Sequence, residues 1–178
     1  MKFVFRITYD QPEAENELAR VLSNLLTGDG EEVIFLCIGT DKNILDCLGP
    51  LVGTMLQEAV PEIPVYGTLD NPVHAKNLVP VLREINKNHP RAREVAVDAC
   101  LGRPEEIGLI KLREGSLFPG KALNKALPAV GDISLTGTVA AYPQENKYRD
   151  LTSGSFAPVY HIARVITQGI RLALGRQL

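Results

Sequence analysis

Two aspartates interrupt stretches of sequence that otherwise have the apolar character of a buried core. Asp46 follows a strand-like run and a short polar turn in CIGTDKNILDCLGPLVG, and Asp98 lies within EVAVDACLG. Two carboxyl groups a few ångströms apart cannot both ionise cheaply, so one pKa rises and the pair shares a proton. One member can then deprotonate a water molecule while the other protonates a leaving amine. A helix beginning beside Asp46 favours its ionised form, which makes Asp46 the expected base and Asp98 the expected acid.

Each aspartate also has a structural interpretation. Aspartate is a favoured N-cap, and a helical pattern follows Asp46 directly. Asp98 can cap a following turn or pair with Arg103, and either contact would offset the desolvation cost of a buried carboxylate. The residues alone therefore leave structure and catalysis open for both positions.

Other catalytic and cofactor-binding chemistries find little support in the sequence. CIGT has one glycine where a dinucleotide fingerprint needs three, and no Walker lysine motif or serine nucleophile elbow occurs. The histidines have no metal-ligand spacing, so we expect neither a cofactor nor a metal. His74 can approach the site from a predicted strand end, although a surface or helix-start position is favoured. Cys47 and Cys100 are expected to be buried as small apolar residues.

The strand patterns explain how these residues could be positioned. Apolar runs without alternation are typical of buried strands in parallel sheets. Alternation of apolar and polar residues in EIGLIKLREG predicts an exposed or edge strand instead. The expected strands cover residues 32–39, 63–69, 93–101, 106–115 and 133–140.

Helical patterns lie between most of these strands. Amphipathic spacing and stop signals mark four helices, the last with an apolar stripe that can serve the core or a subunit contact. Pro50 is tolerated if it lies in a first turn, and Pro80 forces a kink or a later start. A loop rich in glycine and proline, with Lys121, covers residues 116–132. The expected helices cover residues 12–28, 47–60, 71–90 and 155–175.

This alternation predicts an α/β protein. Helices between strands imply parallel crossovers, and hence a three-layer α/β/α sandwich with a mostly parallel sheet. With 178 residues and no linker, the chain is expected to form one domain, residues 1–178. Ligands of such folds bind beyond the carboxyl ends of the strands, where Asp46 and Asp98 both lie.

Composition narrows the range of partners. A net charge of −2 gives no indication of nucleic-acid binding. No segment reaches the roughly 20 apolar residues that cross a membrane, and the N-terminus does not have the pattern of a signal peptide. Scattered cysteines argue against a disulfide framework. We therefore expect a cytoplasmic protein without nucleic-acid or membrane partners.

Several of these motifs resemble those of known families. IGTDKNILDCLGPLVG and VAVDAC resemble the segments around the two catalytic aspartates of the spore germination protease. A strand followed by a Pro-Gly loop and a basic pair, in EIGLIKLREGSLFPGKALNK, continues that likeness. Over nearly the whole chain, FLCIGTDKNILDCLGPLVGTML, VAVDACLG and LPAVGDISLTG resemble the sporulation proteins called YyaC. Hydrogenase-maturation endopeptidases are more distantly similar.

The resemblance implies a phosphorylase/hydrolase-like fold and a catalytic pair at Asp46 and Asp98. It implies a dyad without metal, because GDISLTGTVA lacks the histidine that completes the metal site of the maturation endopeptidases.

We therefore expect a sporulation-associated aspartic-type peptidase that cuts a peptide or small protein. Gly39, Thr40, Asp41 and Lys121 are the expected substrate-side residues, with Gly39 letting the backbone turn closely beneath the site. Lys121 can bind an acidic substrate or only solvate its loop. The alternative is a non-catalytic sporulation factor that binds a peptide or protein partner in the same pocket. A homo-oligomer is possible in either case.

Overall fold

A six-stranded sheet forms the centre of the computed structural model, which describes residues 2–26, 32–120, 127–142 and 155–175. The strand order is β1-β5-β6-β4-β2-β3. Strand β4 pairs in parallel with both β2 and β6, and β2 pairs in parallel with β3. The elements are β1 (Lys2–Thr8), α1 (Ala14–Leu26), β2 (Val33–Cys37), η1 (Ile44–Asp46), α2 (Leu48–Ala59), β3 (Val65–Tyr66), α3 (Leu78–Asn88), β4 (Arg93–Gly102), η2 (Pro104–Glu106), β5 (Leu109–Glu114), β6 (Ile133–Ala141) and α4 (Phe156–Ala173).

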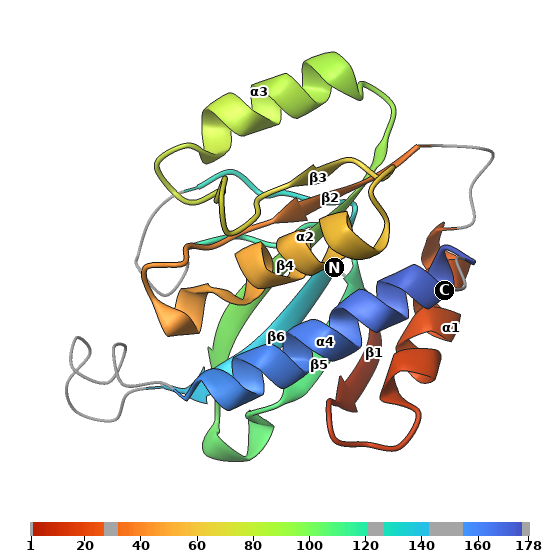
Figure 1. Cartoon of the computed structure of the whole chain (residues 1–178), viewed down its shortest axis with the longest axis vertical. Helices are drawn as coiled ribbons and strands as arrows, with labels where there is room; N and C mark the ends of the chain where they lie inside the picture. The colour runs from red at the N-terminus through yellow and green to blue at the C-terminus, as the bar shows by residue number, and fades with distance from the viewer. Residues whose placement is uncertain (1, 27–31, 121–126, 143–154, 176–178) are drawn as a thin grey trace.

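Helices cover both faces of this sheet (Figure 1). One apolar core lies between the sheet and α1, α2 and α4, and includes Leu18, Val52 and Ile166. A second, smaller core lies on the opposite face beneath α3, where Ile34 and Leu36 of β2 share a cluster with Leu78, Ile85 and others. The predicted three-layer α/β/α arrangement with a mostly parallel sheet is therefore confirmed.

The strand predicted as exposed or edge, residues 106–115, is instead an internal strand. Strand β5 lies between β1 and β6 and runs antiparallel to both. Its apolar side chains Ile110 and Leu112 are fully buried in the core shared with α1, α2 and α4. Lys111 and Arg113 alternate with them and face the other side of the sheet, so the alternation reflects two different faces rather than an edge position.

The prolines define helix starts as expected. Pro50 lies in the first turn of α2, where its missing N–H would have no helical partner. Helix α3 begins only at Leu78, which places Pro80 in its first turn and corresponds to the later start. The short strand predicted at 63–69 is reduced to Val65–Tyr66.

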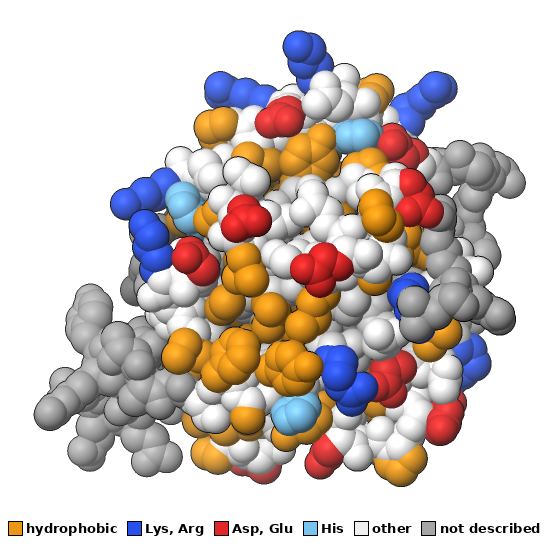
Figure 2. All heavy atoms as spheres, in the orientation of Figure 1, with side chains coloured by type: hydrophobic (Ala, Val, Ile, Leu, Met, Phe, Trp, Pro, Cys, Tyr) orange, Lys and Arg blue, Asp and Glu red, His pale blue; other side chains and the backbone are white. Residues whose placement is uncertain are grey.

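The apolar stripe of α4 packs into the core. Val159, Ala163, Ile166 and Ile170 are completely buried. Phe156 and Tyr160 lie outside the stripe and are 48% and 42% exposed. Figure 2 shows apolar side chains gathered over α2 and α4 on one face of the molecule. Among the described residues, no helix is long and apolar enough to cross a membrane.

Helix α2 approaches the end of β2 closely because glycine faces the strand. A Cβ on Gly49 would lie 2.1 Å from the carbonyl oxygen of Ile38, and a Cβ on Gly53 would lie 1.9 Å from that of Gly67. These neighbours are backbone atoms and cannot rotate away. The glycines thus fix the start of α2, and with it the preceding Asp46, against the sheet.

We expect Gly49→Ala to lower the free energy of unfolding by about 3 kcal/mol, because the methyl group must push α2 away from β2. Gly175→Ala, just after α4, is the control, since a Cβ there would meet nothing within 4 Å and only the φ of +69° disfavours alanine. That variant should lose only about 1 kcal/mol. Urea denaturation followed by circular dichroism measures both free energies of unfolding. Equal losses would contradict a steric cost of the backbone contact at Gly49.

Candidate functional site

A pocket of about 490 Å³ opens where β2 and β4 end, on the face of the sheet that also carries α3. Asp46, Asp98, Gly39 and His74 all line it. The two aspartates are half-buried, so each keeps part of its surface open to the pocket. The structure therefore brings Asp46 and Asp98, the two acids predicted from the sequence to form a pair, to the same pocket.

Asp46 is held by a tight turn after β2. Gly39 has φ +144°, and its N–H donates to the carbonyl of Val73 at 2.8 Å. The next residue, Thr40, donates its N–H to the carbonyl oxygen of Asp46 at 2.9 Å. A Cβ on Gly39 would lie 1.9 Å from that same oxygen. Only glycine lets the loop return onto the strand end in this way.

The structural alternative for Asp46 was an N-cap, and the structure assigns that position elsewhere. Cys47 is the N-cap residue of α2, with no side-chain capping bond, and Asn43 caps the short η1 by accepting from the N–H of Leu45. Asp46 is the last residue of η1 and directly precedes Cys47, the N-cap of α2. Asp46 is therefore not the N-cap of either helix, and it lines the pocket.

Asp98 lies in the second half of β4, paired with Thr136 of β6. The backbone N–H of Ala99 lowers the pKa of the Asp98 carboxyl group in part. Arg103, the partner considered for Asp98, instead pairs with Glu105 at 3.2 Å and Glu106 at 3.5 Å.

Electrostatics link the two acids. Burial raises the pKa of Asp46 to about 6, while the neighbouring His74 lowers it. Burial raises the pKa of Asp98 well above the usual aspartate range, and the negative charge of Asp46 raises it further. The pair therefore has a pH range in which Asp46 is ionised and Asp98 holds a proton, as the general base and acid of one reaction require.

His74 takes part in this site although the sequence favoured a surface or helix-start position for it. It lies in the turn before α3, and its N–H donates to the side-chain oxygen of Asn77 at 2.8 Å. The ring Nδ1 accepts from the N–H of Lys76 at 3.3 Å. Its place at the start of a helix and its place in the pocket are thus compatible.

A basic wall completes the pocket, and sequence reasoning missed it. Lys111 and Arg113 of β5 line the pocket with Thr136 and Cys100. Cys47 is buried as expected, but Cys100 is only half-buried and its Sγ lies 3.4 Å from the hydroxyl of Thr138. The signal for Lys111 and Arg113 is the basic and apolar alternation of LIKLRE, which also fits an edge strand.

Thr40 and Asp41, which were also expected on the substrate side, are not among the residues that line the pocket. The hydroxyl of Thr40 donates to Asp41 at 3.4 Å and accepts from the N–H of Lys42 at 3.3 Å, so these residues shape the loop. Lys121 lies outside the described residues. Within the described part of the chain, no three or more His, Cys, Asp or Glu side chains form a group suited to a metal ion.

The raised pKa of Asp46 has a consequence for stability. The folded-state value of about 6 exceeds the ordinary 3.8, so the folded protein binds the proton more tightly than the unfolded chain. The stabilisation is fully present below pH 3.8 and is lost as the pH rises through 6.

Asp46→Asn removes this titration. We expect the variant to gain about 2 kcal/mol over wild type between pH 4 and pH 7, somewhat less than the full shift implies because the carboxyl group is partly exposed. Urea denaturation at each pH measures the difference. Asp10→Asn, in an exposed turn, should follow wild type at every pH, and the same behaviour from Asp46→Asn would contradict the raised pKa.

Three comparisons relate the chain to known proteins. The fold aligns with the [NiFe] hydrogenase maturation protease HycI from Thermococcus kodakarensis KOD1 at a TM-score of 0.45 and 17% identity, covering 85% of this chain and 99% of that one. The uncharacterized protein YyaC of Bacillus subtilis (strain 168) is 35% identical over 168 residues, which cover 93% of this chain and 82% of YyaC. Residues 6–169 match the family described as a protein of unknown function, DUF1256. The chain belongs to this DUF1256 family, of which its similarity to YyaC is a second indication.

Proposed function

We propose that the protein is an aspartic-type peptidase in which Asp46 and Asp98 activate one water molecule to hydrolyse a peptide bond. The observation that carries the proposal is that both acids line one pocket and that the charge of Asp46 raises the pKa of Asp98. The likeness of their segments to the spore germination protease supports the same reaction and suggests a role in sporulation.

The reaction assigns one proton to each acid. Ionised Asp46 accepts a proton from water as the water oxygen attacks the carbonyl carbon of the substrate. Protonated Asp98 donates a hydrogen bond to the carbonyl oxygen as negative charge develops there. When the C–N bond breaks, the proton of Asp98 passes to the leaving amine. Asp46 is then protonated and Asp98 ionised, and exchange of one proton restores the starting state.

The surroundings suit these roles. His74 lowers the pKa of Asp46 and so favours the ionised base. Burial keeps Asp98 protonated, and the pocket is open to solvent where a peptide could enter. Carboxyl groups kept in different protonation states by their surroundings are typical of acid–base catalysis.

Replacing either acid should abolish hydrolysis. We expect Asp46→Asn and Asp98→Asn each to lower turnover at least about 100-fold, because an amide can neither accept nor supply the proton in flight. Unfolded casein and a proteome-derived peptide mixture serve as substrates, with new chain ends identified by mass spectrometry.

Asp10→Asn is the matched control for this experiment and should cleave as wild type does. Circular dichroism confirms that the Asn variants are folded. Cleavage that persists unchanged in a folded Asp98→Asn protein would exclude the dyad, and the absence of any wild-type cleavage would favour a pocket that only binds peptides.

The dependence of cleavage on pH should be bell-shaped. We expect kcat/KM to rise through about pH 6 as Asp46 ionises and to fall at higher pH as Asp98 loses its proton. Initial rates between pH 4 and pH 10 measure both limbs. A profile that only falls above pH 4 would mean that the ionised form of Asp46 is not the base.

A further inference from the structure

Polar side chains form a row across the open part of the sheet beside the acid pair. Asp98 of β4 pairs with Thr136 of β6, Thr136 pairs with Lys111 of β5, and Lys111 pairs with Arg6 of β1. Directly paired residues present their side chains to the same face of a sheet. The row therefore leads from the proposed acid to two cations.

A second row runs parallel to the first and contains Arg113. This residue pairs with Ser134, which pairs with Ala96 of β4. Lys111 and Arg113 are two residues apart on one strand and so share the pocket face. Because neighbouring strands are about 4.8 Å apart, the backbone of Lys111 lies about 10 Å from that of Asp98.

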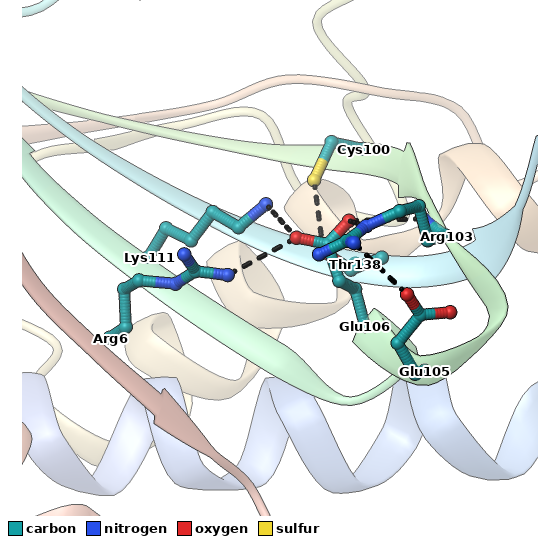
Figure 3. A network of polar contacts seen from close by, with 7 residues as sticks. All are labelled: Arg6, Cys100, Arg103, Glu105, Glu106, Lys111 and Thr138. Carbon is teal, nitrogen blue, oxygen red and sulfur yellow. Dashed lines mark hydrogen bonds and ion pairs between the residues drawn. The ribbon is translucent and has the colours of Figure 1, made fainter.

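Lys111 belongs to a network of cations and carboxylates at the pocket (Figure 3). Its Nζ lies 3.4 Å from Oε1 of Glu106, and the same oxygen lies 3.1 Å from the guanidinium of Arg6. Arg103 approaches the other carboxylate oxygen of Glu106 and also pairs with Glu105. Among the contacts of the described residues, three cations thus approach two carboxylates, and Lys111 also lines the pocket.

Burial strengthens the electrostatic effect of the positive charge on Lys111. The side chain of Lys111 is only 15% exposed, and that of Glu106 only 16%. Charges in a cleft with apolar walls are screened less than charges on an open surface. An incoming carboxylate would therefore gain more from this wall than from an exposed lysine.

We propose that Lys111 and Arg113 form an anion-binding subsite that recognises a carboxylate of the substrate and so selects acidic peptides. This deepens the proposed function, since the carboxylate would lie on the same chain as the scissile bond. An extended peptide advances about 3.3 Å per residue, so the carboxylate lies within about three residues of the bond held at Asp46 and Asp98. An acidic side chain and a free chain end both supply this group.

Binding of short peptides tests the subsite independently of cleavage. The Asp98→Asn protein is used so that hydrolysis cannot remove the probe. Three probes are titrated: acetyl-Ala-Ala-Glu-Ala-Ala-amide, its Gln analogue, and acetyl-pentaalanine with a free carboxylate. Dissociation constants come from the shifts of the Lys111 and Thr136 amides in nitrogen-15 NMR spectra.

We expect at least one carboxylate-bearing probe to bind about fivefold or more tightly than the neutral Gln peptide. Preference for the Glu peptide identifies a side-chain carboxylate, and preference for the free acid identifies a chain end. The advantage should weaken at high salt, because it is electrostatic. Equal affinity of all three probes, or no shift of the two amides by any probe, would overturn the proposal.

Charge variants assign the effect to the two residues. Lys111→Gln and Arg113→Gln should each reduce the preference to less than about twofold, whereas Lys111→Arg should retain it. Lys87→Gln, at an exposed position of α3, is the matched control and should bind as the parent does. A preference that survives both Gln substitutions would contradict the subsite. Its loss in them would support the subsite even if the wild-type protein cleaved no substrate.

Discussion

Two carboxyl groups that share a partly desolvated pocket cannot both ionise without cost, and this constraint governs the site. Burial raises the pKa of both acids, and the charge of Asp46 raises the pKa of Asp98 further. The folded chain therefore gives up some stability at neutral pH to keep Asp46 and Asp98 together. A sheet with ample apolar burial on both faces can tolerate that loss.

Backbone packing, rather than a side-chain network, maintains this arrangement at Asp46. Gly39 allows the loop after β2 to fold back beneath Asp46, and Gly49 lets α2 begin against the backbone of Ile38. Asp98 lies on β4, the strand that pairs with β2. Position is thus set by elements that cannot relax by changing a rotamer, which suits a pair whose mutual repulsion would otherwise separate it.

The aspartates and the layered fold could be predicted because their signals are local and a general topological rule connects them. The carboxyl ends of parallel strands lie at one edge of the sheet, and the acids meet there because β2 and β4 are neighbours. The place of β5 could not be predicted in the same way, since an alternating pattern suits both an edge strand and an internal strand with one polar face. Its basic residues were missed as pocket residues for that reason.

His74 illustrates a different limit. Its approach to Asp46 depends on how the turn before α3 meets the end of β2, and on the hydrogen bond from Gly39 to Val73. No sequence spacing encodes such a tertiary contact. Lys121, in contrast, followed from the composition of its loop alone, and its role remains a prediction.

Carboxyl carbon-13 NMR titration of Asp46 and Asp98 would show whether the two acids form a coupled pair. It reports the protonation of each acid without requiring a substrate. The account predicts that Asp46 titrates near pH 6 and Asp98 well above the usual aspartate range, and that the pKa of Asp98 falls in Asp46→Asn. Titration of both acids near the ordinary 3.8, with no response of Asp98 to Asp46→Asn, would contradict a coupled pair.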